Sequence, residues 1–311
     1  MTETATRPIR TRGRGKRAGK PSPPLLGLAR GVARALSVAA PTPAAIWLER
    51  VFLTPKRYAM PEREKAWMEG AEVWRIGFDA ERSMPLYAWG AGPVVLLAHG
   101  FSGRGSQMGA YIAPLVAQGY RVVTFDAPAH GAADGKRSGL PEAVAALVKV
   151  AAHLGPLAAV VAHSNGAAAC TVALSRGMEC ARVVYVSPPE DLGDFLRRAA
   201  AFLGMTETVA AKAQARIEAR YGMGFEALKG APLAEKQHIP ALIVHDREDE
   251  LIRFGDGERI ARAWPGAQLI ETRGLGHSRI LRDEAVVEAA VRFIGPGREP
   301  GQRRRAVISS S

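Results

Sequence analysis

The chain has 311 residues, 47% of them hydrophobic and 23% charged, a composition typical of a globular protein with a substantial core. Its net charge of +12 is concentrated at the two ends, where residues 1–20 hold seven basic residues against one acidic residue and residues 297–311 hold four against one. The body between them is close to neutral, which argues against a specific nucleic-acid-binding domain. Two cysteines, Cys170 and Cys180, are too few for a disulfide framework and fit a reducing compartment.

The sequence contains no membrane-spanning segment, because no stretch reaches the roughly 18 uncharged apolar residues that a spanning helix needs. The long basic leader also differs from a secretory signal, which has a short charged region, a clean apolar core and small residues at a cleavage site. These two observations predict a cytoplasmic protein.

The N-terminal part divides into a tail and a helical extension. Residues 1–24 are rich in Arg, Gly and Pro and are expected to be disordered. Residues 25–69 are expected to form short helices at Leu25–Val38, Pro43–Phe52 and Glu62–Glu69. The first of these is basic and amphipathic. We expect it to pack against the main domain; a weak contact with a membrane surface through the basic N-terminus is the alternative.

Residues 70–296 alternate between strand-like and helix-like patterns. The predicted strands are residues 73–78, 84–89, 93–98, 120–125, 157–162, 182–187, 240–245 and 267–271. The predicted helices are residues 107–117, 140–153, 165–175, 256–263 and 283–294. Several strands are apolar on both faces, as in a buried parallel sheet. The pattern predicts an α/β domain with a doubly wound sheet, followed by a basic C-terminal tail at 297–311.

One long helical stretch, residues 188–239, interrupts the alternation between two predicted strands. Because it follows the carboxyl end of a strand, it should lie over the edge of the sheet where α/β proteins bind ligands. We expect it to act as a small helical lid. Its aromatic side chains, among them Phe195, Phe202 and Phe225, would give a site at this edge an apolar wall.

The strongest functional signal is the segment Ala162-His163-Ser164-Asn165-Gly166, which lies between a predicted strand and a predicted helix. A serine on such a sharp turn exposes its hydroxyl above the edge of the sheet, and the turn requires small residues two positions before and after it. Ala162 and Gly166 meet this requirement. Ser164 is therefore the candidate nucleophile, and the alternative is an ordinary serine at a helix N-cap.

A nucleophilic serine needs a base and an acid that orients the base. His277, in the glycine-flanked segment Gly274-Leu275-Gly276-His277-Ser278, is the candidate base; the other downstream histidines are His238, just before a strand, and His245, at a strand end. The acid should lie in the loop at residues 246–250. Asp249 is the preferred candidate and Asp246 the alternative, whereas the two glutamates of this loop are expected to face solvent.

The negatively charged oxygen that forms after attack needs two backbone N–H donors. The residue after the nucleophile, Asn165, would supply one. The turn His99-Gly100-Phe101-Ser102-Gly103 after a buried strand would supply the other, from Phe101. Phe101 and His163 are the residues expected to contact the substrate.

Together these segments resemble the α/β-hydrolase superfamily, close to its serine esterase, lipase and aminopeptidase-like branches. The resemblance rests on the turn at residues 99–101, the stretch 126–131, the serine turn at 162–166, the Asp249 loop and Gly276-His277, and covers roughly residues 70–295. It implies an eight-stranded, mostly parallel sheet, with no cofactor and no metal. Ala162 replaces a usual glycine of the family, and His130 and His245 also stand where glycine is frequent.

The expected activity is hydrolysis of a carboxylic ester, or a related acyl bond, of a small-molecule substrate through an acyl-serine intermediate. The aromatic residues of the insertion, Phe195, Phe202 and Phe225, suggest that the substrate carries an apolar acyl group. The same triad would serve a thioesterase or an acyltransferase, so these remain alternatives. A non-catalytic relative used for binding or scaffolding is the alternative from a different class, and such a protein would be expected to lack one of the triad residues or the small residues of the serine turn.

Overall fold

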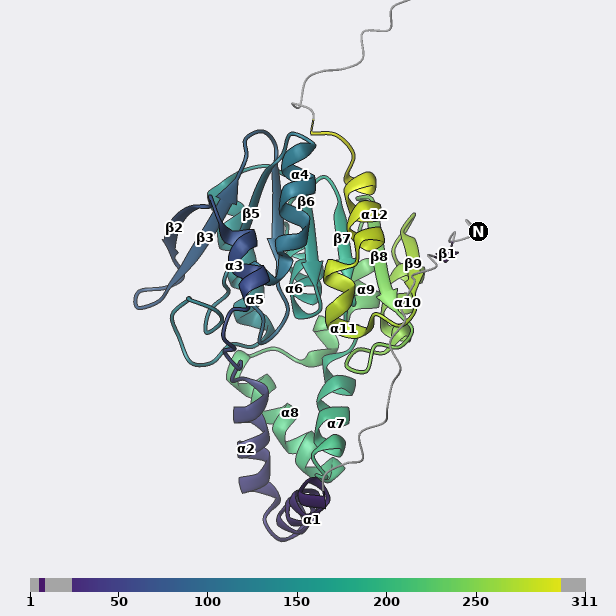
Figure 1. Cartoon of the computed structure of the whole chain (residues 1–311). Coiled ribbons are helices and arrows are strands. Elements are labelled where there is room, and N and C mark those ends of the chain that lie inside the picture. Colours follow the sequence, from purple (N-terminus) through teal and green to yellow (C-terminus); the bar gives the residue numbers. More distant parts are fainter. Residues whose placement is uncertain (1–5, 9–23, 298–311) are drawn as a thin grey trace, which may run out of the picture.

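The computed structural model describes residues 6–8 and 24–297, which are built around one sheet (Figure 1). The strand order is β1-β9-β8-β7-β6-β4-β5-β3-β2. The strands are β1 (Thr6–Pro8), β2 (Glu72–Gly77), β3 (Ser83–Trp89), β4 (Val94–Ala98), β5 (Arg121–Phe125), β6 (Leu157–His163), β7 (Val183–Val186), β8 (Ala241–Asp246) and β9 (Gln268–Thr272). β3 runs antiparallel to both β2 and β5, and the remaining pairs are parallel.

The eight strands predicted from the sequence are all present, so the expectation of a mostly parallel eight-stranded sheet is confirmed. The ninth strand, β1, pairs with β9 at the edge of the sheet, with Thr6 opposite Leu269. Its residues fall in the tail for which composition predicts disorder, and for Thr6–Pro8 that expectation is wrong. An edge strand offers unpaired backbone groups that a short extended segment can bind, whatever its side chains. The rest of residues 1–23, and residues 298–311, lie outside the described residues.

The helices agree closely with the sequence pattern. They are α1 (Pro24–Ala39), α2 (Pro41–Phe52), α3 (Glu62–Met68), α4 (Ile112–Ala117), α5 (Leu140–Leu154), α6 (Asn165–Ser175), α7 (Leu192–Phe202), α8 (Glu207–Tyr221), α9 (Gly230–Ala234), α10 (Phe254–Ala263), α11 (Gly276–Arg279) and α12 (Glu284–Ile294). Three short 3-10 helices are η1 (Gly105–Tyr111), η2 (Phe225–Leu228) and η3 (Ile280–Arg282). The single helix predicted at 107–117 is therefore divided into η1 and α4. None of these helices has the length and apolarity needed to cross a bilayer.

Alternate residues of each central strand face opposite sides of the sheet, because successive side chains of a strand point in opposite directions. Val95, Leu97 and Val244 belong to the core on the side of η1, α4 and α12. Leu96 and Ile243 belong to the core on the side of α5, α6 and α10. The sheet is thus covered by helices on both faces, which explains why its strands are apolar throughout.

Four helices form a separate group beyond one end of the sheet (Figure 1). α7 and α8 come from the predicted insertion, and α1 and α2 from the N-terminal extension; we call these four helices the cap. Glu49 of α2 is buried and accepts hydrogen bonds from Nε of Arg216 at 2.7 Å and Nε of Arg220 at 2.8 Å, both on α8. The N-terminal extension therefore packs against the insertion, a contact between segments far apart in the sequence.

Candidate active site

Ser164 stands at the carboxyl end of β6, where the chain turns sharply into α6. Its φ is +50° and its ψ −122°, a backbone conformation that residues other than glycine rarely adopt. Its N–H still donates to the carbonyl oxygen of Val186 at 3.0 Å, so the sheet holds the residue on one side. α6 begins at the next residue, Asn165. Ser164 therefore occupies the strained strand-to-helix turn that the sequence predicts.

Two glycines allow the backbone to close around this turn. A Cβ at Gly166 would lie 2.6 Å from the carbonyl oxygen of His99, so α6 can approach the end of β4 only because this residue has no side chain. A Cβ at Gly100 would lie 3.0 Å from Cβ of Ser164 and 3.0 Å from Nδ1 of His163. The turn that carries Phe101 is thus packed directly against Ser164.

His277 lies on α11, after β9, and contacts a carboxylate from the loop after β8. Its Nδ1 is 2.8 Å from Oδ2 of Asp249. The other carboxylate oxygen of Asp249 accepts the N–H groups of Leu251 and Ile252, each at 2.9 Å. Burial opposes ionisation of this carboxyl, but hydrogen bonds from His245, His277 and Ile252 outweigh it and hold the pKa of Asp249 well below its usual range. Asp249 is therefore an ionised acceptor for the imidazole.

The alternative acid, Asp246, has a different set of partners. One of its oxygens accepts the hydroxyl of Thr272 at 2.8 Å and the N–H of Leu275 at 3.0 Å, and the other accepts the N–H of Glu248 at 2.9 Å. These bonds join the loop after β8 to the loop that leads to His277. Asp246 thus holds the two loops together, while Asp249 contacts the imidazole.

A second histidine, His245, contacts Asp249 from inside the protein. Its Nε2 lies 3.6 Å from Oδ2 of Asp249 and 3.2 Å from the carbonyl oxygen of Ile252. The side chain is fully buried at the end of β8, and a Cβ at Gly257 of α10 would come within 2.3 Å of its Nδ1. The sequence offers this residue as a downstream histidine at a strand end, without a role beside Asp249. The departure from the family's usual glycine is the signal that marks it.

His163 also contacts the candidate base. Its Nε2 donates to the carbonyl oxygen of His277 at 3.1 Å, and the two rings lie 4.6 Å apart. Burial, together with the neighbouring imidazole of His277, lowers the pKa of His163 well below its usual value, so the ring stays neutral. The residue before Ser164 therefore supports the loop that carries His277.

The turn at residues 99–101 is held by two neutral imidazoles. His99 donates from Nδ1 to the carbonyl oxygen of Gly100 at 2.8 Å and accepts the N–H of Ala127 at Nε2 at 3.0 Å. Burial lowers its pKa to about 4. His130 packs edge-on against the ring of Phe101 at 5.5 Å, and burial lowers its pKa to about 3. Both residues thus fix the position of Phe101.

Ser164, Asn165, His163, His277 and Phe101 all border one cavity of about 590 Å³. The rest of its wall is mostly apolar and comes partly from the predicted insertion, through Leu192, Phe195, Ile217, Tyr221, Met223, Phe225 and Leu228. The N-terminal extension adds Val51, Phe52, Leu53 and Tyr58, which sequence reasoning missed. For the first three, the only signal was the apolar run at 51–53, at the end of the helix predicted over residues 43–52.

One aromatic side chain expected to mark the substrate site lies elsewhere. Phe202 is at the end of α7, is 63% exposed, and does not border the cavity. Phe195, seven residues earlier on the same helix, does border it, with its ring 6.0 Å from that of Phe52. Seven residues are close to two helical turns, so Phe195 and Phe202 lie on the same side of α7. The cavity borders only the first part of α7, which leaves Phe202 outside it.

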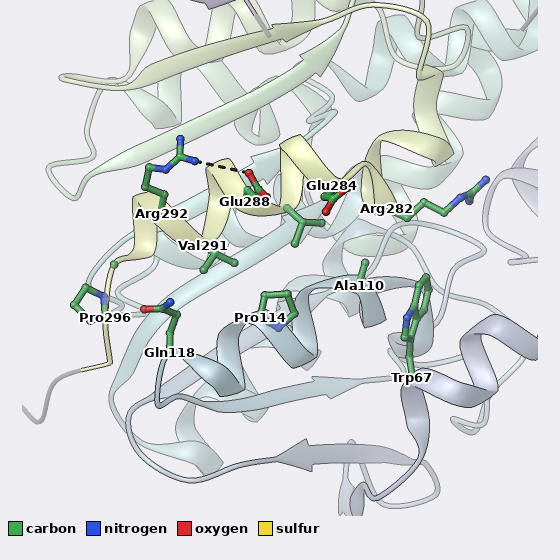
Figure 2. A pocket seen from close by; sticks show the side chains of 12 residues that line it. Trp67, Ala110, Pro114, Gln118, Arg282, Glu284, Glu288, Val291, Arg292 and Pro296 are labelled. Atoms are coloured by element: carbon green, nitrogen blue, oxygen red, sulfur yellow. Dashed lines mark ion pairs between the residues drawn. The ribbon is translucent and has the colours of Figure 1, made fainter. Parts of the chain in front are cut away.

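A second hollow, of about 770 Å³, is lined by residues of other elements (Figure 2). Trp67 of α3 and Pro114 of α4 line one side of it, and Val291 and Arg292 of α12 line the other. The ion pair drawn in it joins Arg292 to Glu288 at 3.9 Å, within one helix. None of the candidate catalytic residues borders this hollow. In the described part of the chain, no cluster of three or more His, Cys, Asp or Glu side chains is arranged to hold a metal ion.

Comparison with known proteins agrees with this architecture. The model of the alpha/beta hydrolase family matches residues 94–289, more than half of the chain, and the chain belongs to this family. An esterase of Pyrococcus furiosus superimposes with a TM-score of 0.59 at 19% identity, over 78% of this chain and 98% of that one.

Two further solved structures share the fold. A thioesterase domain from the curacin biosynthetic pathway matches with a TM-score of 0.54 at 21% identity, over 73% of this chain and 99% of that one. A membrane phospholipase A, described as a bacterial virulence factor, matches with a TM-score of 0.58 at 16% identity, over 87% of this chain and 97% of that one. At these identities the similarity shows the fold alone.

Proposed function

We propose that the protein is a serine hydrolase that cleaves a carboxylic ester, or a related acyl bond, through an acyl-Ser164 intermediate. The observation that carries the proposal is the grouping of Ser164 and His277 on one cavity, with the imidazole of His277 bound to Asp249 at 2.8 Å. Membership of the alpha/beta hydrolase family supports hydrolysis in general. The strained backbone at Ser164 supports its role as the nucleophile.

In the proposed reaction, Nε2 of His277 takes the proton of the Ser164 hydroxyl while Oγ attacks the carbonyl carbon of the substrate. The tetrahedral intermediate collapses, the bond to the leaving group breaks, and His277 returns the proton to the leaving alkoxide. Water then attacks the acyl-enzyme by the same route and releases the carboxylic acid. Asp249 keeps the Nδ1 proton of His277 in place and stabilises the imidazolium.

The proposed oxyanion donors are the backbone N–H groups of Asn165 and Phe101. Asn165 is the first residue of α6, and the first N–H groups of a helix have no partner within it. The N-terminal end of a helix also favours negative charge. Phe101 follows Gly100, which packs against Cβ of Ser164 and so brings this turn next to the reacting atom.

The apolar wall of the cavity supports a substrate with an apolar acyl group. Phe195, Ile217 and Phe225 of the insertion and Phe52 of α2 would surround that group. Phe101, which is 38% exposed and borders the cavity, would contact the substrate near its carbonyl. His163 also borders the cavity and supports the loop of His277. The insertion would then act as a lid, completed by α2. The two free, buried cysteines support a reducing, cytoplasmic location.

The test is hydrolysis of p-nitrophenyl esters of increasing acyl length by wild type and Ser164→Ala. Wild type should prefer medium or long acyl chains, and the variant should lose at least about 10³-fold in kcat. Ser187→Ala is a matched control, because Ser187 is also buried with a φ of +51° at a strand end but does not border the cavity. Equal activity of wild type and Ser164→Ala would overturn the proposal.

A further inference from the structure

The outer side of the cap carries a group of exposed apolar side chains. Leu36 of α1 is 55% exposed, Trp47 of α2 is 48% exposed, and Phe202 of α7 is 63% exposed. With Val32 of α1 they surround a hollow of about 470 Å³. Among the described residues that line this hollow, only Arg30 is charged. We call Val32, Leu36, Trp47 and Phe202 the cap face.

This concentration is unusual within the molecule. Of the twelve large apolar side chains that are well exposed in the described part of the chain, seven lie on α1, α2 and α7. They are Val32, Leu36, Val38, Ile46, Trp47, Val51 and Phe202. Contiguous apolar surface of this kind on a folded protein usually marks a place of interaction, whereas single exposed apolar residues do not.

The cap face is held in place by contacts that leave its apolar groups uncovered. The Arg30 side chain lies over the ring of Phe202 at 5.9 Å, and its guanidinium donates to the carbonyl oxygen of Ala201 at 3.4 Å. The backbones also approach each other closely, because a Cβ at Gly204, just after α7, would come within 2.6 Å of the carbonyl oxygen of Arg30. α1 is thus packed closely against the end of α7, at the far end of the cap from the sheet (Figure 1).

The charges that α1 and α2 expose near this face are basic. Arg30, Arg34 and Arg50 are exposed on α1 and α2. The one acidic residue of these helices, Glu49, is buried and bound to two arginines of α8. Two copies joined through this face by a twofold axis would bring like charges together, whereas a bilayer with anionic headgroups would meet both the apolar centre and the basic surroundings.

One helix, α2, contributes both to this face and to the cavity that Ser164 borders. Trp47 and Val51 are four residues apart on α2 and therefore lie on one side of the helix. Val51 is 41% exposed and also borders the cavity, together with its neighbour Phe52. Tryptophan is moreover enriched at the membrane interface, between the headgroups and the acyl chains. α2 thus connects an exposed apolar surface to the wall of the candidate active site.

We propose that the cap face docks on the surface of an anionic lipid bilayer, and that the acyl substrate passes from the bilayer along α2 to Ser164. The docking surface is the folded face of three helices rather than the basic N-terminal residues alone. The second half of the proposal rests on the proposed serine hydrolase activity; the docking itself does not.

Docking is tested with the full chain and vesicles of phosphatidylcholine mixed with phosphatidylglycerol, compared with vesicles of phosphatidylcholine alone. Wild type and Ser164→Ala should both sediment with the anionic vesicles. The triple variant Leu36→Ser, Trp47→Ser, Phe202→Ser should partition about tenfold more weakly. Val73→Ser with Val148→Ser is the control, because these exposed apolar residues lie elsewhere on the body. Its binding should equal that of wild type.

The triple variant should keep wild-type activity on p-nitrophenyl acetate, because none of its three positions borders the cavity. The two halves of the proposal can fail separately. If Ser164→Ala loses activity on the ester but still binds vesicles, both the docking and the reaction stand. If Ser164→Ala stays active, the proposed reaction is wrong, and vesicle binding alone then decides whether the cap face docks. Full vesicle binding by the triple variant, or binding abolished only by deleting residues 1–23, would overturn the cap face as the contact.

A second measurement does not depend on the triple variant folding. Brominated lipids should quench the tryptophan emission of wild type more than that of Trp47→Phe, because Trp47 would lie among the headgroups. Equal quenching in the two proteins would contradict the proposed orientation. Light scattering tests whether a second copy of the chain covers the face instead. A wild-type dimer that does not bind vesicles, and that the three substitutions dissociate, would show this and would overturn the lipid docking.

Discussion

Nδ1 of His277 lies 2.8 Å from Oδ2 of Asp249, although the two residues are 28 positions apart in the chain. They come from the loops after β9 and β8, which are neighbouring parallel strands, so the sheet itself brings the loops together. Asp246 adds direct bonds between the two loops, through Thr272 and Leu275. The pairing of imidazole and carboxylate is therefore built into the strand order.

Replacing Asp249 by Asn should lower kcat by about 10³- to 10⁴-fold with little change in KM. The amide has almost the same shape, but it cannot stabilise the imidazolium of His277 and favours the wrong tautomer. Steady-state kinetics on a p-nitrophenyl ester, with circular dichroism as the check on folding, would measure this. A variant that keeps more than about a tenth of wild-type kcat would show that another group orients His277.

His245 should act as a positioning residue for Asp249. Its Nε2 lies between Oδ2 of Asp249 and the carbonyl oxygen of Ile252, so removing it leaves the carboxylate less fixed. His245→Ala is expected to lower kcat about tenfold with KM unchanged, and His245→Gln, whose amide can donate from a similar place, should recover part of the loss. Equal kcat in the alanine and glutamine variants would contradict this role.

The glycine at position 100 should be essential for the turn that carries Phe101. Gly100→Ala would place a methyl group 3.0 Å from Cβ of Ser164, and the turn would have to move. A displaced oxyanion donor costs about 10²- to 10³-fold in kcat. Gly31→Ala is the control, since a Cβ there meets no atom within 4 Å. Similar kinetics for the two variants would exclude the proposed contact.

The acyl pocket can be tested within a single helix. Phe195→Ala removes a ring that borders the cavity, and should raise KM for p-nitrophenyl octanoate about tenfold while leaving the acetate ester unaffected. Phe202→Ala, on the same α7 but exposed, should change neither value when the esters are in free solution. The opposite pattern, with Phe202→Ala impaired and Phe195→Ala normal, would place the acyl group outside the cavity.

Stability should fall as the pH is lowered from about 6.5 to about 4. Burial lowers the pKa of His99 to about 4 and that of His130 to about 3, so in this range the unfolded chain binds protons that the folded chain does not. The free energy of unfolding therefore rises with pH there, by about 3 kcal/mol for His99 alone. Urea unfolding of wild type and His99→Gln at several pH values would show a shallower pH dependence in the variant. Parallel curves would contradict a neutral His99.

The sheet and the serine turn were predictable because their signals are local. Strands such as β4 and β8 are apolar on both faces, and Ser164 is flanked by the small residues that its turn requires. The packing of α2 on α8 was not predictable, since Glu49 and Arg216 are 167 positions apart and each is an ordinary charged residue on its own helix. The same is true of His245, whose contact with Asp249 depends on how the loop after β8 curls back.

The direction of an exposed aromatic residue is likewise set by tertiary packing. Phe195 and Phe202 lie on the same helix, and only the arrangement of the cap decides that one borders the cavity while the other is exposed. β1 depends on a free edge at β9, which composition does not reveal.

The most direct test of the central claim is labelling with a fluorophosphonate probe, comparing wild type with Ser164→Ala and Ser187→Ala. An activated serine reacts covalently with the probe, so wild type and Ser187→Ala should be labelled, with the adduct on the peptide that contains Ser164, and Ser164→Ala should not. A folded wild-type protein that stays unlabelled, or an adduct on another serine, would contradict the proposed nucleophile.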